Sequence, residues 1–145
     1  MQSTKQNLCS MASHEIYSKT PLDLQGQSIR LVEILSVNET TGITLTFHTR
    51  QLHANPESAE AAPEYFALSY TWGHTANQRR VVVDGTEFSI RENLWLFLQQ
   101  QRYLLTGGYL AKGDLIWIDA LCIDQGNIPE RNHQVMMMAS IFSQV

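Results

Sequence analysis

A chain of 145 residues with 43% hydrophobic residues suits one globular domain and is too apolar to remain disordered. The net charge is −4 and no basic stripe is present, so electrostatics argue against nucleic acid as a partner. We expect a cytoplasmic protein without a membrane segment: no apolar run approaches the ~18 residues of a bilayer span, no secretory signal is visible, and two cysteines make no disulfide framework.

The chain begins with a polar stretch that precedes the first strands. Residues 1–27 are rich in Ser, Gln, Thr and Lys and are predicted to be a poorly ordered leader, followed by a domain over residues 28–145. Apolar and polar residues then alternate from Ile29 to Val37 and again from Ile43 to Leu52, as in strands. The turn cluster Asn38–Gly42 between them predicts an N-terminal β-hairpin.

The second half of the chain alternates strand and helix patterns. Tyr65–Tyr70 is predicted to be a short strand. Val81–Val83 and Thr86–Phe88 flank Asp84-Gly85, a dipeptide typical of two-residue hairpin turns, which predicts an inserted β-hairpin. Apolar residues at helical spacing predict a helix over residues 91–105.

A strand and a helix complete the predicted elements. The apolar run Leu115–Ile118 reads as a buried strand, and Asn127 can cap a final helix with Pro129 in its first turn. The predicted buried stripe of this helix consists of Val135, Met138, Ile141, Phe142 and Val145. Strand, helix, strand and helix in this order indicate an α/β fold, so we expect Phe66–Ser69 and Leu115–Ile118 to be adjacent parallel strands.

Polar residues gather where the second of these strands ends. Asp119 follows the strand directly, and Asp124, Gln125, Glu130 and Arg131 come shortly after. In an α/β sheet the carboxyl ends of the strands form the ligand crevice, so these residues are ligand-binding candidates.

Each candidate also has a structural interpretation. Asp119 can brace the loop that follows it, and Asp124 and Gln125 can stabilise the turn. A carboxylate such as Glu130 is favoured in the first turn of a helix, and Arg131 is either a surface charge or an anion clamp.

Other chemistries fit the sequence less well. Cys122 with His74 or His133 could form a thiol–imidazole pair, but neither histidine belongs to a known signature and a cysteine is usually a buried apolar residue. Asp119 and the carboxylates after it could gather Mg²⁺, but their spacing fits no calcium loop and no metal site is predicted. No phosphate-binding loop is present.

The sequence resembles the fungal heterokaryon incompatibility (HET) domain from about Tyr65 to its last residue. The resemblance rests on Ala67-Leu68-Ser69-Tyr70-Thr71-Trp72-Gly73, the Val81–Leu94 segment, Trp117-Ile118-Asp119-Ala120-Leu121-Cys122-Ile123-Asp124-Gln125, Glu130-Arg131 and Gln134-Val135. These separate segments agree with the family in order and spacing. Asp124 stands where the family often has Asn. Because family members usually continue further, the domain is expected to be incomplete at its C-terminus.

The resemblance implies a fold and further site residues. HET domains are regarded as relatives of TIR domains, which implies a partial flavodoxin-like or TIR-like parallel sheet to which both hairpins are added. Ser69, Tyr70, Trp72 and Gly73 would then lie near Asp119 and are further ligand-binding candidates.

The resemblance also implies a function, for which two classes remain open. In the first, the chain is a signalling module of fungal allorecognition and programmed cell death that acts by self-association or by binding another protein. In the second, it is a nucleotide-binding domain or a TIR-like hydrolase with NAD as its substrate. The catalytic glutamate of TIR enzymes lies after a third strand that this chain lacks, so no catalytic residue and no cofactor is assigned.

Overall fold

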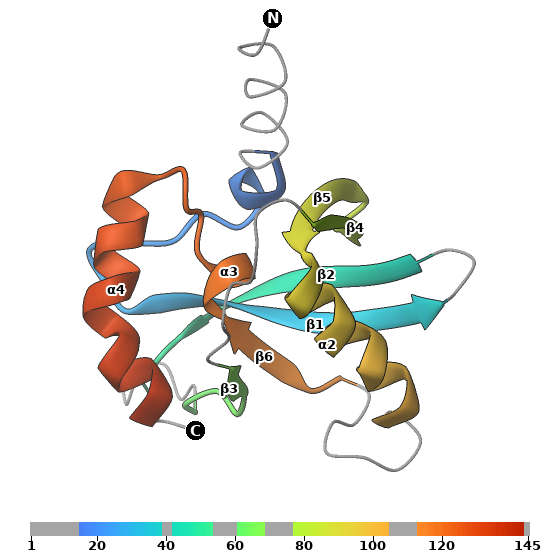
Figure 1. The fold of residues 1–145 in the computed structure, drawn as a ribbon. Helices are drawn as coiled ribbons and strands as arrows, with labels where there is room; N and C mark the ends of the chain where they lie inside the picture. Colours follow the sequence, from blue (N-terminus) through green and yellow to red (C-terminus); the bar gives the residue numbers. More distant parts are fainter. Residues whose placement is uncertain (1–14, 39–41, 54–60, 69–76, 105–112, 144–145) are drawn as a thin grey trace, which may run out of the picture.

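The computed structural model is an α/β fold built around one mixed sheet (Figure 1). It describes residues 15–38, 42–53, 61–68, 77–104 and 113–143. In chain order the elements after a helical turn at residues 15–18 are β1 (Ser28–Asn38), β2 (Gly42–Gln51), β3 (Phe66–Leu68), β4 (Gln78–Val83), β5 (Thr86–Arg91), α2 (Glu92–Leu104), β6 (Leu115–Ile118), α3 (Asp119–Cys122) and α4 (Ile128–Ser143). The six strands of the sheet have the order β3-β6-β1-β2-β4-β5.

Both predicted hairpins are confirmed. β1 and β2 pair antiparallel from Ser28↔Gln51 to Asn38↔Gly42, with a bulge between Ile34 and Ser36. β4 and β5 pair antiparallel around a turn in which Asp84 has φ 50° and Gly85 has φ 83°. Positive φ at both turn positions matches the right-handed twist of the strands, which explains why Asp-Gly occupies this turn.

The predicted parallel neighbours are also confirmed. Phe66 pairs with Ile116 and Leu68 with Ile118, so β3 and β6 run parallel, and α2 lies in the connection between them. The sheet as a whole is mixed rather than parallel, because β6 pairs antiparallel with β1 of the N-terminal hairpin. A parallel pair also joins β2 to β4. The hairpin therefore forms the middle of the sheet instead of an addition to its edge.

The helices bury one face each against this sheet. Leu94 and Leu98 of α2 belong to the core, and Figure 1 shows α2 in front of the sheet and α4 beside it. The core also extends into the helical turn at residues 15–18, because Ile16 and Tyr17 are buried. None of the helices in the described parts of the chain is long and apolar enough to cross a membrane.

The predicted buried stripe of α4 is largely wrong. The helix buries Glu130, Gln134, Met137 and Ile141, whereas Val135 and Phe142 are exposed and Met138 is half-buried. Val145 lies outside the described residues. The physical reason is that Glu130 and Gln134, on the inner face, are polar but have buried hydrogen-bond partners. A prediction from hydrophobicity alone therefore assigns burial to a neighbouring face of the helix.

Candidate functional site

A buried ion pair lies at the start of α4. Glu130 is 4% exposed and Arg30 of β1 is fully buried, with 2.9 Å between Arg30 Nη2 and Glu130 Oε1. The guanidinium also donates to the Cys122 carbonyl from Nη1 (2.8 Å) and to the Thr20 carbonyl from Nη2 (2.7 Å). Its Cζ lies 4.8 Å from the centroid of the Tyr17 ring. This packing compensates the desolvation of a buried charge, which is costly without hydrogen-bonded partners.

The carboxylate of Glu130 also closes the loop between α3 and α4. Its Oε2 accepts the Asp124 backbone N–H. Asn127 caps α4, because its Oδ1 accepts the Glu130 N–H at 3.2 Å, as the sequence predicted. The Asn127 N–H donates to the Asp124 carbonyl at 3.0 Å, and the Gly126 N–H to Asp124 Oδ1 at 3.2 Å. The interpretation of Asp124 as a turn-stabilising residue therefore matches its contacts. Glu130 lies in the first turn of α4 as predicted, but its ion pair with Arg30 was not predicted.

Asp119 and Gln125 lie on the β6 side of the same loop. Asp119 begins α3 directly after β6 and is half-buried, with Oδ1 2.8 Å from the Ala120 N–H. The Gln125 side chain donates to the Asp119 carbonyl at 3.0 Å. Because Leu68 and Ile118 pair in register, Asp119 lies at the carboxyl ends of both parallel strands, where the crevice was predicted.

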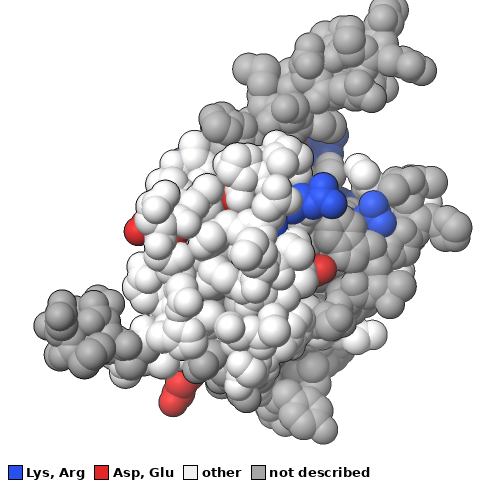
Figure 2. Space-filling view, turned by 90° about the vertical axis from the view of Figure 1, so that its left-hand side faces the viewer, with Lys and Arg blue, Asp and Glu red and all other residues white. Residues whose placement is uncertain are grey.

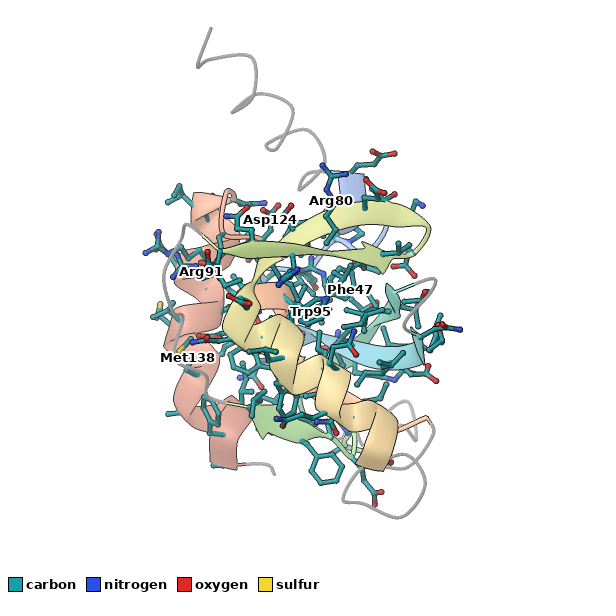
Figure 3. The ribbon with its side chains drawn as sticks, turned by 45° about the vertical axis from the view of Figure 1, so that its right-hand side comes forward. Phe47, Arg80, Arg91, Trp95, Asp124 and Met138 are labelled. Atoms are coloured by element: carbon teal, nitrogen blue, oxygen red, sulfur yellow. The ribbon has the colours of Figure 1, made fainter. Side chains whose placement is uncertain are left out.

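Of the other candidates, only Arg131 lies in the described part of the chain. Arg131 is exposed on α4, next in sequence to the buried Glu130. Ser69, Tyr70, Trp72 and Gly73 lie outside the described residues, so their predicted proximity to Asp119 stays a prediction. Figure 3 shows Asp124 near the N-terminal end of α4, with Met138 further along that helix.

The thiol chemistry considered for Cys122 is contradicted. Cys122 is fully buried, and burial raises the pKa of its thiol to about 12, so the reactive thiolate is scarce near neutral pH. Its Sγ lies 3.4 Å from the Ile118 N–H, which donates to it. The His133 ring pairs with the Gly26 carbonyl at 2.9 Å, and His74 lies outside the described residues.

The loop between α3 and α4 shows neither a group of metal ligands nor a hollow large enough for a nucleotide in the described part of the chain. No group of three His, Cys, Asp or Glu side chains in the described part of the chain could hold a metal ion. The hollow that Tyr17, Asp124 and Glu130 help to line has a volume of about 140 Å³, below the ~300 Å³ at which small-molecule pockets begin.

A larger hollow lies elsewhere and was not predicted. It has a volume of about 600 Å³, and Asp23, Arg50 and His53 are among its lining residues. None of the predicted site residues that the structure describes lines it. Sequence reasoning also missed Arg30, although a charged residue in phase with the apolar Val32 and Ile34 was a usable signal for a buried partner.

Comparisons with known proteins now agree with the motifs. The family model described as heterokaryon incompatibility protein (HET) matches residues 65–145. The chain is 34% identical over 89 residues to heterokaryon incompatibility protein 6, OR allele, of Neurospora crassa, a match that covers 56% of this chain and 13% of that relative. The matched segment thus spans about an eighth of the relative's length, and no solved structure matches the chain. The chain belongs to the heterokaryon incompatibility (HET) family.

Proposed function

We propose that this chain is a signalling module of fungal heterokaryon incompatibility, which acts in allorecognition and programmed cell death by contacting another protein or another copy of itself. The observation that carries the proposal is the HET match over residues 65–145. The Neurospora relative, whose printed name refers to the same process, supports it. We place this activity in the cytoplasm, where fusing cells exchange their contents.

The contacts of the motif residues favour an interaction module over an enzyme. Glu130 forms an ion pair with Arg30 and accepts a hydrogen bond from the Asp124 N–H. The side-chain amide of Gln125 donates a hydrogen bond to the Asp119 carbonyl. A general acid or base must reach its substrate, and Glu130 is buried within protein contacts. These residues connect β6, α4 and β1 to one another, which gives them a structural role in the contacts described.

The alternative of a TIR-like NAD hydrolase or nucleotide-binding domain keeps one structural argument. The parallel pair β3–β6, connected through α2, is the part of the sheet that a flavodoxin-like or TIR-like fold would share. Asp119 lies at its carboxyl end and is the described residue best placed to contact a ligand there. We therefore keep Asp119 as the candidate ligand contact.

Inducible expression of the chain in a filamentous fungus tests the proposal. We expect growth arrest and uptake of a vital dye after induction. Asp119→Ala should prevent both if the strand-end crevice takes part, whereas Glu64→Ala, which removes an exposed carboxylate, should not. Normal growth at a verified protein level would refute the proposal.

Purified protein incubated with NAD at high protein concentration separates the two classes. Release of nicotinamide that Asp119→Ala abolishes would support the hydrolase and overturn the interaction module. Intact NAD together with growth arrest in the fungus supports the interaction module.

A further inference from the structure

The outer face of α4 carries exposed apolar side chains at a regular interval. Ile128 is 55% exposed, Val135 51% and Phe142 39%, and the three are spaced seven residues apart. Residues seven apart on an α-helix differ by only ~20° around its axis, so the three side chains form one stripe, here called the α4 seam. Met136, beside the seam, is 86% exposed.

The surface around the seam carries almost no charge. From Asn132 to Ser143 α4 contains no Asp, Glu, Lys or Arg. Figure 2 shows this side of the molecule, and most of its described surface is drawn white, for residues that are neither acidic nor basic. The inner face of the helix is separately occupied by Gln134, Met137 and Ile141, so the seam is a second face, whose three side chains remain 39% to 55% exposed. A row of exposed apolar side chains on an almost uncharged helix face is typical of interaction sites.

One side chain of the α4 seam, Phe142, is ordered by contact with the core. The Phe142 ring meets the ring of the buried Trp117 edge to face, with 5.5 Å between their centroids. A side chain that is already ordered loses less entropy on binding, which favours it as an anchor at an interface.

The spacing and charge of α4 fit another helix as the partner, and specifically a second α4. One apolar side chain in every seven residues stays on the same side of α4 and can lie along a facing helix. Arg131 is exposed in the first turn, where a cation opposes the helix dipole, and the last turn of α4 has no basic residue. In an antiparallel pair each Arg131 would lie beside the partner's last turn and supply the missing cation. In a parallel pair the two Arg131 side chains would face each other and repel.

We propose that two copies of this chain associate through an antiparallel pair of α4 helices centred on Val135. Ile128 of each copy then meets Phe142 of the other, and the two Arg131 residues are about 12 Å apart along the axis, at ~1.5 Å per residue. The inference deepens the proposed function by naming the surface for self-association. One helix per copy is a small interface, so we expect a dissociation constant on the order of 10 µM to 1 mM.

Sedimentation equilibrium of the purified chain from 10 µM to 1 mM tests the association. We expect a monomer–dimer equilibrium, and Val135→Glu should raise the dissociation constant about tenfold or more, because it places two carboxylates opposite each other. Leu96→Glu is the matched control: Leu96 is 46% exposed on α2, and its replacement should leave the constant unchanged. A wild-type chain that is monomeric at 1 mM, or equal effects of the two variants, would overturn the proposal.

Cysteine cross-linking tests the direction of the pair, in a background with Cys9→Ser. Val135→Cys should form an inter-chain disulfide, Ile128→Cys alone should not, and a mixture of Ile128→Cys with Phe142→Cys should. Efficient cross-linking of Ile128→Cys alone would show a parallel pair and refute the arrangement. Arg131→Glu should weaken the dimer without changing the thermal melt of the monomer. Because these measurements need no living cell, their failure would leave the growth test of the proposed function unaffected.

Discussion

Replacement of the buried Arg30 should destabilise the fold far more than replacement of Arg131, which is exposed. In Arg30→Met the carboxylate of Glu130, which is 4% exposed, keeps its bond to the Asp124 N–H but loses its counter-ion. The carbonyls of Thr20 and Cys122 lose a donor at the same time. Breaking one side of a buried ion pair costs about 3–5 kcal/mol.

That loss is a large share of the free energy of unfolding, which is typically ~5–15 kcal/mol for a domain. At about 2–4 °C per kcal/mol for a domain of this size, the melting temperature should fall by about 6–20 °C. Met fills much of the space of the arginine stem, so the loss reports the uncompensated charge more than an empty cavity.

Urea unfolding followed by circular dichroism measures the difference. Arg131→Met is the matched control, because this arginine is exposed, and its replacement should change stability by less than about 0.5 kcal/mol. The double variant Arg30→Met/Glu130→Gln should recover part of the loss, since neither charge then remains buried alone.

Two results would refute this reasoning. A loss below about 1 kcal/mol in Arg30→Met would show that the pair does not hold the loop. A double variant whose loss equals the sum of both single losses would show that Arg30 and Glu130 act independently.

Three further predictions concern the same region. Asn127→Ala should lower the free energy of unfolding by about 0.5–2 kcal/mol through loss of the α4 cap, and Asn127→Asp should retain most of it in the same urea assay. Burial raises the pKa of the Cys122 thiol to about 12 from 9.0, so a Cys9→Ser variant should not react with a thiol reagent at pH 8 while it is folded. The contribution of the neutral Cys122 thiol to stability should be full below pH 9 and fall as the pH rises from 9 towards 12, where only the unfolded thiol ionises. Tyr17→Phe should cost about 0.5–1.5 kcal/mol, because the Tyr17 hydroxyl donates to the Leu121 carbonyl at 2.8 Å, and an unchanged melting temperature would contradict this.

Elements with a local sequence signal were predicted well. The Asp84-Gly85 turn and the Asn127 cap depend on a few neighbouring residues, and both are present. The parallel pair of β3 and β6 followed from two apolar runs with a helix between them. Each of these signals lies within the element or in the connection between two elements.

Features set by distant partners were not predictable in the same way. The polar inner face of α4 exists because Glu130 meets Arg30 and Gln134 donates to the Ser28 carbonyl at 3.0 Å, and both partners lie about a hundred residues upstream. A prediction from the spacing of apolar residues treats polar positions such as Glu130 and Gln134 as exposed. The place of the N-terminal hairpin between β6 and β4 is likewise set by tertiary pairing rather than by any local pattern.

The position of Arg30 in the chain has a consequence for how HET domains should be dissected. The family match begins at residue 65, but the counter-ion of Glu130 and the strand that pairs with β6 both come from β1, before that boundary. A fragment cut at residue 65 would keep every family motif, yet it would leave a carboxylate unpaired in an apolar interior and one side of β6 without hydrogen-bond partners. The segment that the family model matches therefore lacks contacts that residues before it supply, and a loss of activity in such a fragment should be interpreted only after its folding has been measured.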